Sequence, residues 1–228
     1  MIELYSDATP NGLKISIALE ELGLDYKMHR VFLGGEQFTF EFTAMNPNNK
    51  IPVLVDDGFV VTESGAILVY LAEKTGKLLP IDTQPRAKVI ESLMFQMSAL
   101  GPMFGQFLVF AGAWGNKFPE VTNRYFLEVS RIMGVLNKRL EGKPFMAGNE
   151  FSIADIAFIP WIRMCAIHPV GANLPLRDNE NLSAWWDNVS SRPAVERGLA
   201  NPEPFPQDAQ YEAFVKATIG LGTLELPK

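Results

Sequence analysis

Two stretches decide the fold of this chain: Asn48-Asn49-Lys50-Ile51-Pro52-Val53-Leu54-Val55 and Thr62-Glu63-Ser64-Gly65-Ala66-Ile67. They predict a turn with an Ile-Pro bond, a short strand, a tight turn at 56–58, a second strand and then a helix. Proline makes a cis bond far more common, and a cis turn would point the backbone groups of Ile51 outward, where an extended ligand could pair with them. The helix that begins at Glu63 offers free N–H groups to a carboxylate. Together the stretches suit a small zwitterionic peptide.

The residues around these stretches predict an α/β domain over residues 1–80. Apolar spacing and the stop signals Gly23 and Gly76 set its elements. The elements are a strand (2–5), a helix (11–22), a strand (27–33), a weak helix (36–44), two hairpin strands (53–56 and 59–62) and a helix (63–75). The expected order is therefore βαβ-α-ββα.

After a proline-punctuated linker at 79–85, the sequence predicts an all-helical domain over residues 86–228. Its expected helices are a long region at 85–111 that is interrupted or bent at Gly101-Pro102, an amphipathic helix at 123–140, a helix from Ser152 to about 167, and a shorter helix at 182–191. Ser152 and Asp155 have the spacing of a capping box. Residues 201–228 are rich in Pro and Gly and are expected to be a tail on the surface.

Composition excludes several classes of partner. The chain has 228 residues, 47% hydrophobic content and a net charge of −6. An acidic chain is not expected to bind nucleic acid or an anionic membrane, and we expect no apolar stretch to approach a membrane span. The N-terminal residues lack a basic segment and an apolar signal core, so we expect a cytoplasmic protein.

The few cysteine and histidine residues limit the chemistry. Cys165 is the single cysteine, which excludes an internal disulfide and a CxxC redox pair. It lies inside the helix expected at 152–167 and is interpreted as an inert core thiol. The two histidines, His29 and His168, are far apart in sequence and predict no metal site.

The sequence resembles the glutathione transferase superfamily over roughly residues 1–200. The resemblance rests on the Ile-Pro turn, on Glu-Ser-Gly at the start of the next helix, and on Ser-Ile-Ala-Asp at 152–155. The details Thr9-Pro10-Asn11-Gly12, Gly35-Glu36-Gln37-Phe38, Asn46–Pro52 and Gly101-Pro102-Met103-Phe104-Gly105-Gln106 resemble the nu class and the neighbouring fungal nitrogen-regulator-like branch. The resemblance implies a thioredoxin-like first domain, glutathione as co-substrate, no metal, and a homodimer whose interface the long helical region would supply.

The resemblance also implies roles for residues that would bind glutathione. Glu63 would accept the ammonium group, Ser64 would bind the γ-glutamyl carboxylate, and the backbone of Ile51 would pair with the cysteinyl amides. The alternative is that Glu63 and Ser64 simply favour a helix start. Gln37 and Lys50 are candidates for the glycyl end, although Lys50 could equally be a solvated surface lysine.

An arginine at the position of Arg131 reaches toward the carboxylate end of glutathione in nu-class relatives, and an arginine can clamp a carboxylate bidentately. Arg124, Arg131 and Lys138 recur every seven residues on one face of the helix at 123–140. The alternative for all three is a solvated basic face, which we accept for Arg124 and Lys138.

Activation of the glutathione thiol is assigned to Thr9 and Asn11, whose hydroxyl and amide could donate to the sulfur at the start of the first helix. The turn departs from the Ser-Pro-x-Ser pattern of relatives, and Tyr5 and Ser6 are the fallback donors. The alternative is that Thr9 and Asn11 only cap the helix. Because no cysteine stands at the nucleophile position, disulfide chemistry would use the thiol of glutathione itself.

Phe104 and Phe107 are candidates for an apolar second-substrate pocket. The first functional hypothesis is a glutathione-dependent transferase and disulfide-bond reductase acting on small or glutathione mixed disulfides, with possible conjugation of electrophiles. The second is a non-catalytic glutathione-binding module with a regulatory or protein-interaction role. A third is ether cleavage or peroxide reduction on the same scaffold.

Overall fold

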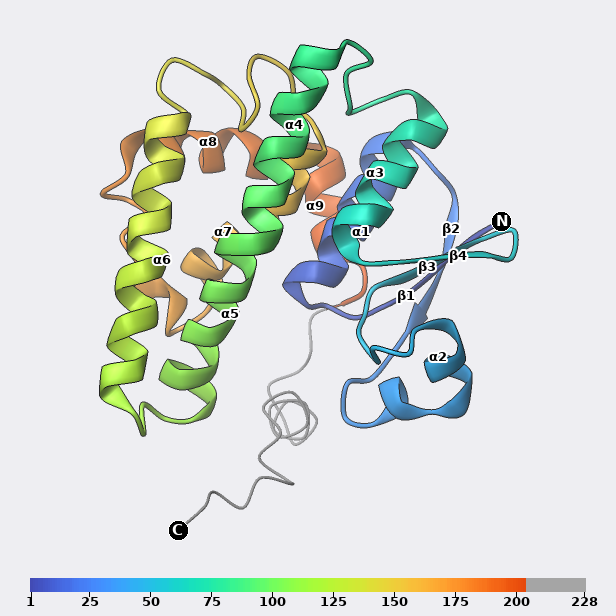
Figure 1. Cartoon of the computed structure of the whole chain (residues 1–228), viewed down its shortest axis with the longest axis horizontal. Coiled ribbons are helices and arrows are strands. Elements are labelled where there is room, and N and C mark those ends of the chain that lie inside the picture. Colours follow the sequence, from blue (N-terminus) through green and yellow to red (C-terminus); the bar gives the residue numbers. More distant parts are fainter. Residues whose placement is uncertain (204–228) are drawn as a thin grey trace.

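The computed structural model describes residues 1–203, and the tail predicted at 201–228 lies almost wholly outside them (Figure 1). A four-stranded sheet has the order β2-β1-β3-β4. Its strands are β1 (Ile2–Ser6), β2 (Tyr26–Arg30), β3 (Val53–Asp56) and β4 (Phe59–Thr62). β1 pairs parallel with β2 and antiparallel with β3, and β3 pairs antiparallel with β4. The predicted βαβ-α-ββα order is confirmed.

Two helices cover one face of this sheet, α1 (Pro10–Leu22) and α3 (Ser64–Thr75). Ile2 and Leu4 of β1 point into their shared core. The other face carries a smaller cluster built around Phe42 of α2 (Phe40–Met45), which follows a 3-10 turn at Glu36–Phe38. α1 ends at Gly23, whose φ of 67° is the left-handed conformation that glycine adopts freely.

The first part of the helical domain is one continuous helical stretch, Thr83–Ala113. It comprises α4 (Thr83–Phe95), a π turn (Gln96–Leu100), α5 (Gly101–Leu108) and a second π turn (Val109–Ala113). The sequence predicts an interruption or bend at Gly101-Pro102, and the wide turn lies directly before this pair. Pro102 has no N–H and its ring would clash with the preceding turn of a regular α-helix, a conflict that π geometry relieves.

By length and composition alone, the stretch Thr83–Ala113 could cross a membrane, with a mean hydropathy of 1.3. The expectation that no apolar stretch approaches a membrane span is therefore wrong on those two criteria. Part of the stretch lies in the protein core: Leu93, Leu100 and Phe104 are completely buried, and 33% of its most apolar window is buried. A core helix of a folded domain satisfies the same two criteria.

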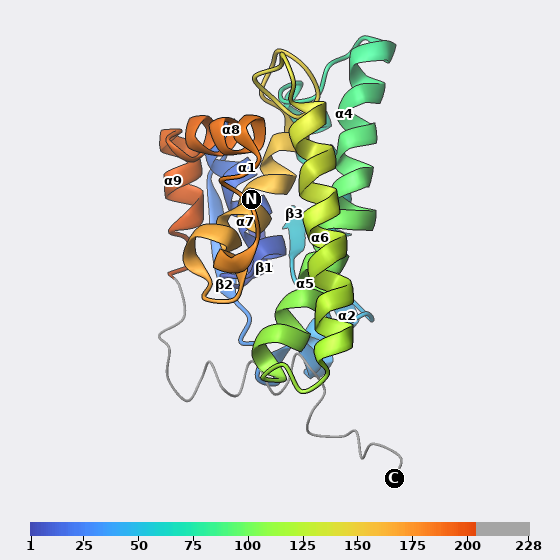
Figure 2. The same cartoon turned by 90° about the vertical axis from the view of Figure 1, so that its left-hand side faces the viewer.

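The remaining helices are α6 (Pro119–Arg139), α7 (Ile153–Ile167), α8 (Glu180–Ser190) and α9 (Pro193–Leu199), with a 3-10 turn at Gly171–Asn173. α6 buries Val129, Met133 and Leu136, the face predicted from its periodicity. The predicted capping box at the start of α7 is present, with Ser152 and Asp155 as its two members. The views in Figures 1 and 2 show the helices standing beside the α/β domain.

A single hydrophobic core joins the two domains. α1 packs against both α7 and α9, and α7 also contacts α3. Gly198 of α9 lies so close to α1 that a Cβ there would stand 2.5 Å from Ile17 Cα. The ion pair between Arg192 and Glu21 adds a polar link across the same boundary (2.7 Å). The helical domain is therefore held firmly against the elements that build the site.

Candidate functional site

The strand register brings the predicted binding segments to one end of the sheet. Tyr5 pairs with Val53, and Val53 pairs with Thr62. The end of β1, the start of β3 and the end of β4 therefore stand side by side. The chain leaves this end through the turn before α1, enters it through Ile51-Pro52, and leaves it again into α3 through Glu63.

Thr9 caps α1 and keeps its hydroxyl proton free. Its Oγ1 accepts a hydrogen bond from the backbone N–H of Gly12 (3.3 Å), and its backbone has the extended conformation of an N-cap. A threonine oxygen can accept this bond and still donate its own proton. The capping role and the predicted thiolate-donor role are therefore compatible.

Asn11 is oriented by Trp161 from α7. The indole Nε1 of Trp161 donates to Asn11 Oδ1 across 3.2 Å. An indole N–H can only donate, so this contact assigns the amide oxygen to the tryptophan side and leaves the Asn11 NH2 group to donate elsewhere. That is the group that the sequence analysis assigns to the sulfur. Trp161 itself was missed, because nothing near residue 161 in the sequence points to residue 11.

The start of α3 combines an unusual backbone with uncapped N–H groups. Glu63 has a positive φ of 68°, a backbone conformation that costs a non-glycine residue on the order of 1 kcal/mol and is concentrated at functional sites. Its side chain is exposed and does not cap the helix. The first N–H groups of α3 therefore remain open to an anion, with the Glu63 carboxylate beside them to accept an ammonium.

Ser64 lies beside a buried lysine that the sequence analysis missed. Lys14 of α1 is 1% exposed, and its Nζ donates to Ser64 Oγ across 3.3 Å. Burial lowers the pKa of Lys14 to about 7, while the negative charge of Glu63 acts in the opposite direction. The available signal was a lysine flanked by apolar residues in the first helix, Leu13-Lys14-Ile15.

The turn before β3 has the predicted geometry. The Ile51–Pro52 bond is cis, and Ile51 makes no backbone hydrogen bond to another residue in the range 1–203. Its N–H and C=O are therefore open to an extended ligand. Lys50 is exposed, and its carbonyl accepts from Asn46 Nδ2 (2.7 Å), a bond that shapes the turn.

Gln37 is buried in the loop before α2 rather than presented as an open side chain. Its Oε1 accepts from the N–H of Gly35 (3.1 Å), and its Nε2 donates to the carbonyl of Leu33 (3.0 Å). These bonds shape the loop, and one amide hydrogen is left over. A role for Gln37 at the glycyl end stays a prediction.

Three residues are not placed as predicted within a single chain. Arg131 is exposed and forms a bidentate ion pair with Glu128 one turn earlier (2.8 and 2.9 Å). It lies on α6, which packs on α5 and α8, and α5 stands between α6 and the α/β domain in Figure 1.

Phe104 and Phe107 are 0% and 3% exposed and pack in the core against Trp161 and Phe126. They do not line an open pocket, because their spacing directs them inward.

The fallback donors are also engaged elsewhere. The ring of Tyr5 stacks on His29 with centroids 4.4 Å apart, and burial together with the charge of Glu3 raises the pKa of Tyr5. Ser6 is completely buried behind the turn. Burial raises the pKa of Cys165 to about 12, which agrees with an inert thiol. Thr9 and Asn11 remain the best-placed donors.

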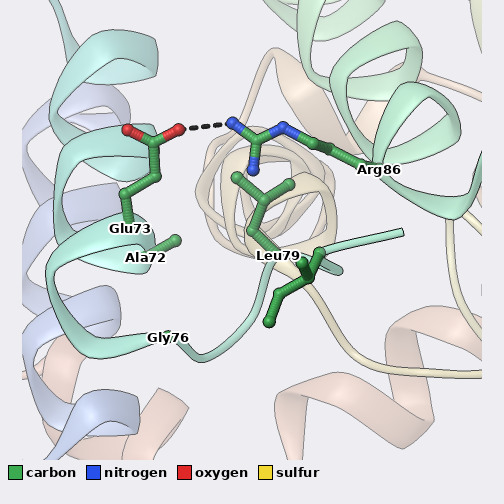
Figure 3. Close-up of a pocket in the computed structure, with 6 residues that line it drawn as sticks. Ala72, Glu73, Gly76, Leu79 and Arg86 are labelled. Carbon is green, nitrogen blue, oxygen red and sulfur yellow. Dashed lines mark hydrogen bonds and ion pairs between the residues drawn. The ribbon is translucent and has the colours of Figure 1, made fainter. Parts of the chain in front are cut away.

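A hollow of about 330 Å³ lies away from this site, between the end of α3 and the start of α4 (Figure 3). Ala72, Gly76, Leu79 and Ile81 line it together with the ion pair of Glu73 and Arg86. None of the predicted site residues contributes to its wall. No group of three or more potential metal ligands occurs in residues 1–203.

Comparison with known proteins identifies the family of this chain. Family models described as glutathione S-transferase N-terminal domain and C-terminal domain match residues 8–74 and 100–193. The disulfide-bond oxidoreductase YfcG of Escherichia coli is 44% identical, over 87% of this chain and 94% of the relative. The disulfide-bond oxidoreductase YghU of the same organism is 37% identical, over 86% and 73%.

Solved structures show the same likeness. A glutathione transferase family member from Pseudomonas fluorescens with two glutathione bound has a TM-score of 0.84 and 42% identity, covering 87% of this chain and 92% of its own. A glutathione transferase from Pseudomonas putida, with one glutathione disulfide bound per subunit, has a TM-score of 0.83 and 42% identity, covering 88% and 91%. The chain therefore belongs to the glutathione S-transferase family.

Proposed function

We propose that this chain is a glutathione-dependent disulfide-bond reductase and transferase that uses the thiolate of bound glutathione as its nucleophile. The observation that carries the proposal is the pair of free donors at the start of α1, the Thr9 hydroxyl and the Asn11 amide. They stand at the same end of the sheet as the open backbone of Ile51 and the uncapped start of α3. The names of the relatives, and the glutathione and glutathione disulfide in the related structures, support the same activity.

Binding follows from the three segments. The γ-glutamyl carboxylate is placed at Ser64 and the first N–H groups of α3, with the ligand ammonium beside Glu63. The cysteinyl amides pair with the backbone of Ile51 in the manner of an added strand. This arrangement puts the sulfur at the start of α1, where Thr9 and Asn11 donate to it.

The donors favour the ionised sulfur. A free thiol titrates near pH ~8.5, and each unit by which its pKa falls reflects about 1.4 kcal/mol of preference for the thiolate. The thiolate attacks one sulfur of a disulfide substrate, forms a mixed disulfide with it and expels the other sulfur as a thiolate. A second glutathione thiolate attacks the mixed disulfide, so that two substrate thiols and one glutathione disulfide result after protonation.

A homodimer and a cytoplasmic location complete the proposal. Met94 of α4 and Leu127 of α6 are exposed apolar side chains, 52% and 56% accessible in the single chain, and we place them at the interface between two copies. Arg131, on the same helix as Leu127, would then be available to the site of the partner subunit. Glutathione is kept reduced in the cytoplasm, as the reaction requires. Light scattering on the protein and on Leu127→Glu tests the dimer, because a buried charge at an interface should yield a monomer.

The decisive experiment measures turnover of 2-hydroxyethyl disulfide with glutathione, beside an aryl-halide conjugation assay, for the unmodified chain and Asn11→Ala. Loss of one donor to a developing charge should lower kcat by about tenfold or more. Turnover that is equal in both proteins would remove Asn11 from the mechanism. Calorimetric binding of glutathione with no turnover in either assay would instead support the non-catalytic module.

A further inference from the structure

The ammonium of Lys14 is a buried positive charge behind the proposed carboxylate position. Its Nζ donates to Gln96 Oε1 (2.7 Å), Met97 Sδ (3.3 Å) and Ser64 Oγ (3.3 Å). These contacts use all three N–H donors of the ammonium, and all three acceptors are neutral. A buried charge without a paired anion is costly, so the site is built to gain from an incoming negative charge.

The charged groups around Lys14 do not supply that partner. On the side of α3 the carboxylate of Glu63 acts on it, and the side chain of Glu63 is exposed. The π turn that follows α4 contributes only the neutral Gln96 and Met97. The other helices packed on α1 also carry charged side chains, Asp155 and Arg163 on α7 and Glu196 and Arg197 on α9. Asp155 accepts from four donors of its own surroundings, and Arg197 pairs with Glu20.

Ser64 connects Lys14 to the open side of the site. One lone pair of Ser64 Oγ accepts from Lys14, so its hydroxyl proton points to another acceptor. Among residues 1–203 the acceptor is Met97 Sδ at 3.8 Å, and a thioether is a weak acceptor. A carboxylate at the start of α3 would replace it with a far stronger bond, and the charge on Lys14 polarises the hydroxyl in that direction.

We propose that Lys14 is a positioning residue of the glutathione site: acting through Ser64, its ammonium supplies the positive charge that balances the γ-glutamyl carboxylate at the start of α3. This inference rests on the function proposed above. The start of α1 would then contribute to glutathione binding in two ways. Thr9 and Asn11 donate to the sulfur, and the buried ammonium of Lys14, one turn later, balances the charge of the carboxylate.

The arrangement couples binding to a proton. Burial lowers the pKa of Lys14 to about 7, so around neutral pH a part of the ligand-free molecules carries a neutral lysine. A bound carboxylate favours the charged form and raises the pKa. Binding therefore takes up a proton at pH values between the free and the bound pKa. Well below the pKa of Lys14 in the ligand-free protein, the lysine is charged both with and without ligand, and binding takes up no proton.

The probe is S-methylglutathione, because its sulfur carries no ionisable proton. Calorimetric titration of the full chain in buffers of different ionisation enthalpy counts the protons taken up. We expect a net uptake at about pH 7.5 and almost none at about pH 5.5, with Kd rising by at most about tenfold per pH unit above neutrality. Binding without uptake at the higher pH overturns this inference and leaves the proposed function standing. Absence of binding at every pH overturns both.

Three variants separate the charge from the packing. Lys14→Met keeps an unbranched chain without charge and should bind more weakly at pH values below neutrality and lose the proton uptake. Lys14→Arg keeps a charge at all these pH values and should bind with little pH dependence. Lys27→Met, at an exposed position of β2, is the matched control and should behave as the unmodified chain. Undiminished uptake in Lys14→Met would refute the assignment, and if neither Lys14 variant folds, the titration of the unmodified chain decides.

Discussion

Trp161 Nε1 donates to Asn11 Oδ1 across 3.2 Å, and this bond ties the orientation of the proposed thiolate donor to the helical domain. Trp161 belongs to α7, which buries 11 of its 15 residues and contacts α1 and α3 of the α/β domain. The α/β domain therefore supplies the donor, while the helical domain determines which end of its amide faces the ligand.

Removal of the indole donor should impair catalysis more than stability. In Trp161→Phe the ring volume is largely kept, but the Asn11 amide is free to turn. The loss of one neutral hydrogen bond is worth about 1 kcal/mol, so we expect kcat/KM for 2-hydroxyethyl disulfide to fall roughly fivefold. Trp186→Phe, on α8, makes the same chemical change at a buried position away from Asn11 and serves as control. Equal losses in the two variants would show a packing effect only.

The hydroxyl of Thr9 should both lower the pKa of the bound glutathione thiol and stabilise the start of α1. Thr9→Ala removes both the cap and the donor, so we expect about 1 kcal/mol of lost stability and a higher pKa of the bound glutathione thiol. Thr9→Ser keeps both groups and should restore both properties. Ultraviolet thiolate absorbance as a function of pH gives the pKa, and urea unfolding gives the stability. A thiol pKa that is the same in all three proteins would remove Thr9 from thiol activation.

Asp155 is expected to contribute strongly to stability. It is completely buried, and its two oxygens accept from the N–H groups of Met146 and Ser152, the Ser152 hydroxyl and the Trp185 indole at 2.8–3.1 Å. Burial raises the pKa of this carboxyl, and the four donors oppose the shift. Asp155→Ala leaves several buried donors without acceptors, so unfolding free energy should fall by about 3 kcal/mol or more.

Chemical denaturation followed by far-ultraviolet circular dichroism measures that loss. The control is Asp187→Ala, which removes an exposed carboxylate paired with Arg177 (2.9 Å) and should cost less than about 1 kcal/mol. Similar losses in the two variants would contradict the role given to the buried network.

The thiol of Cys165 should neither react with reagents nor take part in turnover while the protein is folded. Burial raises the pKa of its thiol to about 12, so almost no thiolate exists at neutral pH. We expect an alkylating reagent to modify it only after unfolding, and Cys165→Ala to retain disulfide reduction. Fast modification of the folded protein, or loss of turnover in Cys165→Ala together with a normal melting temperature, would assign it a chemical role.

The order of elements, the Thr9 cap and the capping box at Ser152 and Asp155 could all be predicted from the sequence. The turn at Ile51-Pro52 and the helix start at Glu63 belong to the same group. Each of these features depends on residues a few positions apart, so the local spacing that sets caps, turns and periodicity is visible in the chain itself. Membership of the family followed from the same local motifs.

The tertiary structure alone decided which side chains meet. Lys14 reaches residues 50 and 82 positions away, and Asn11 is held by a tryptophan 150 positions away. The periodicity of the sequence shows that Phe104 and Phe107 share a helix face, but it does not show that other side chains bury this face. The order of the helices likewise does not reveal that α6, which carries Arg131, packs on α5 and α8. Such contacts depend on how complete elements pack, and this packing is a property of the whole core rather than of any short segment.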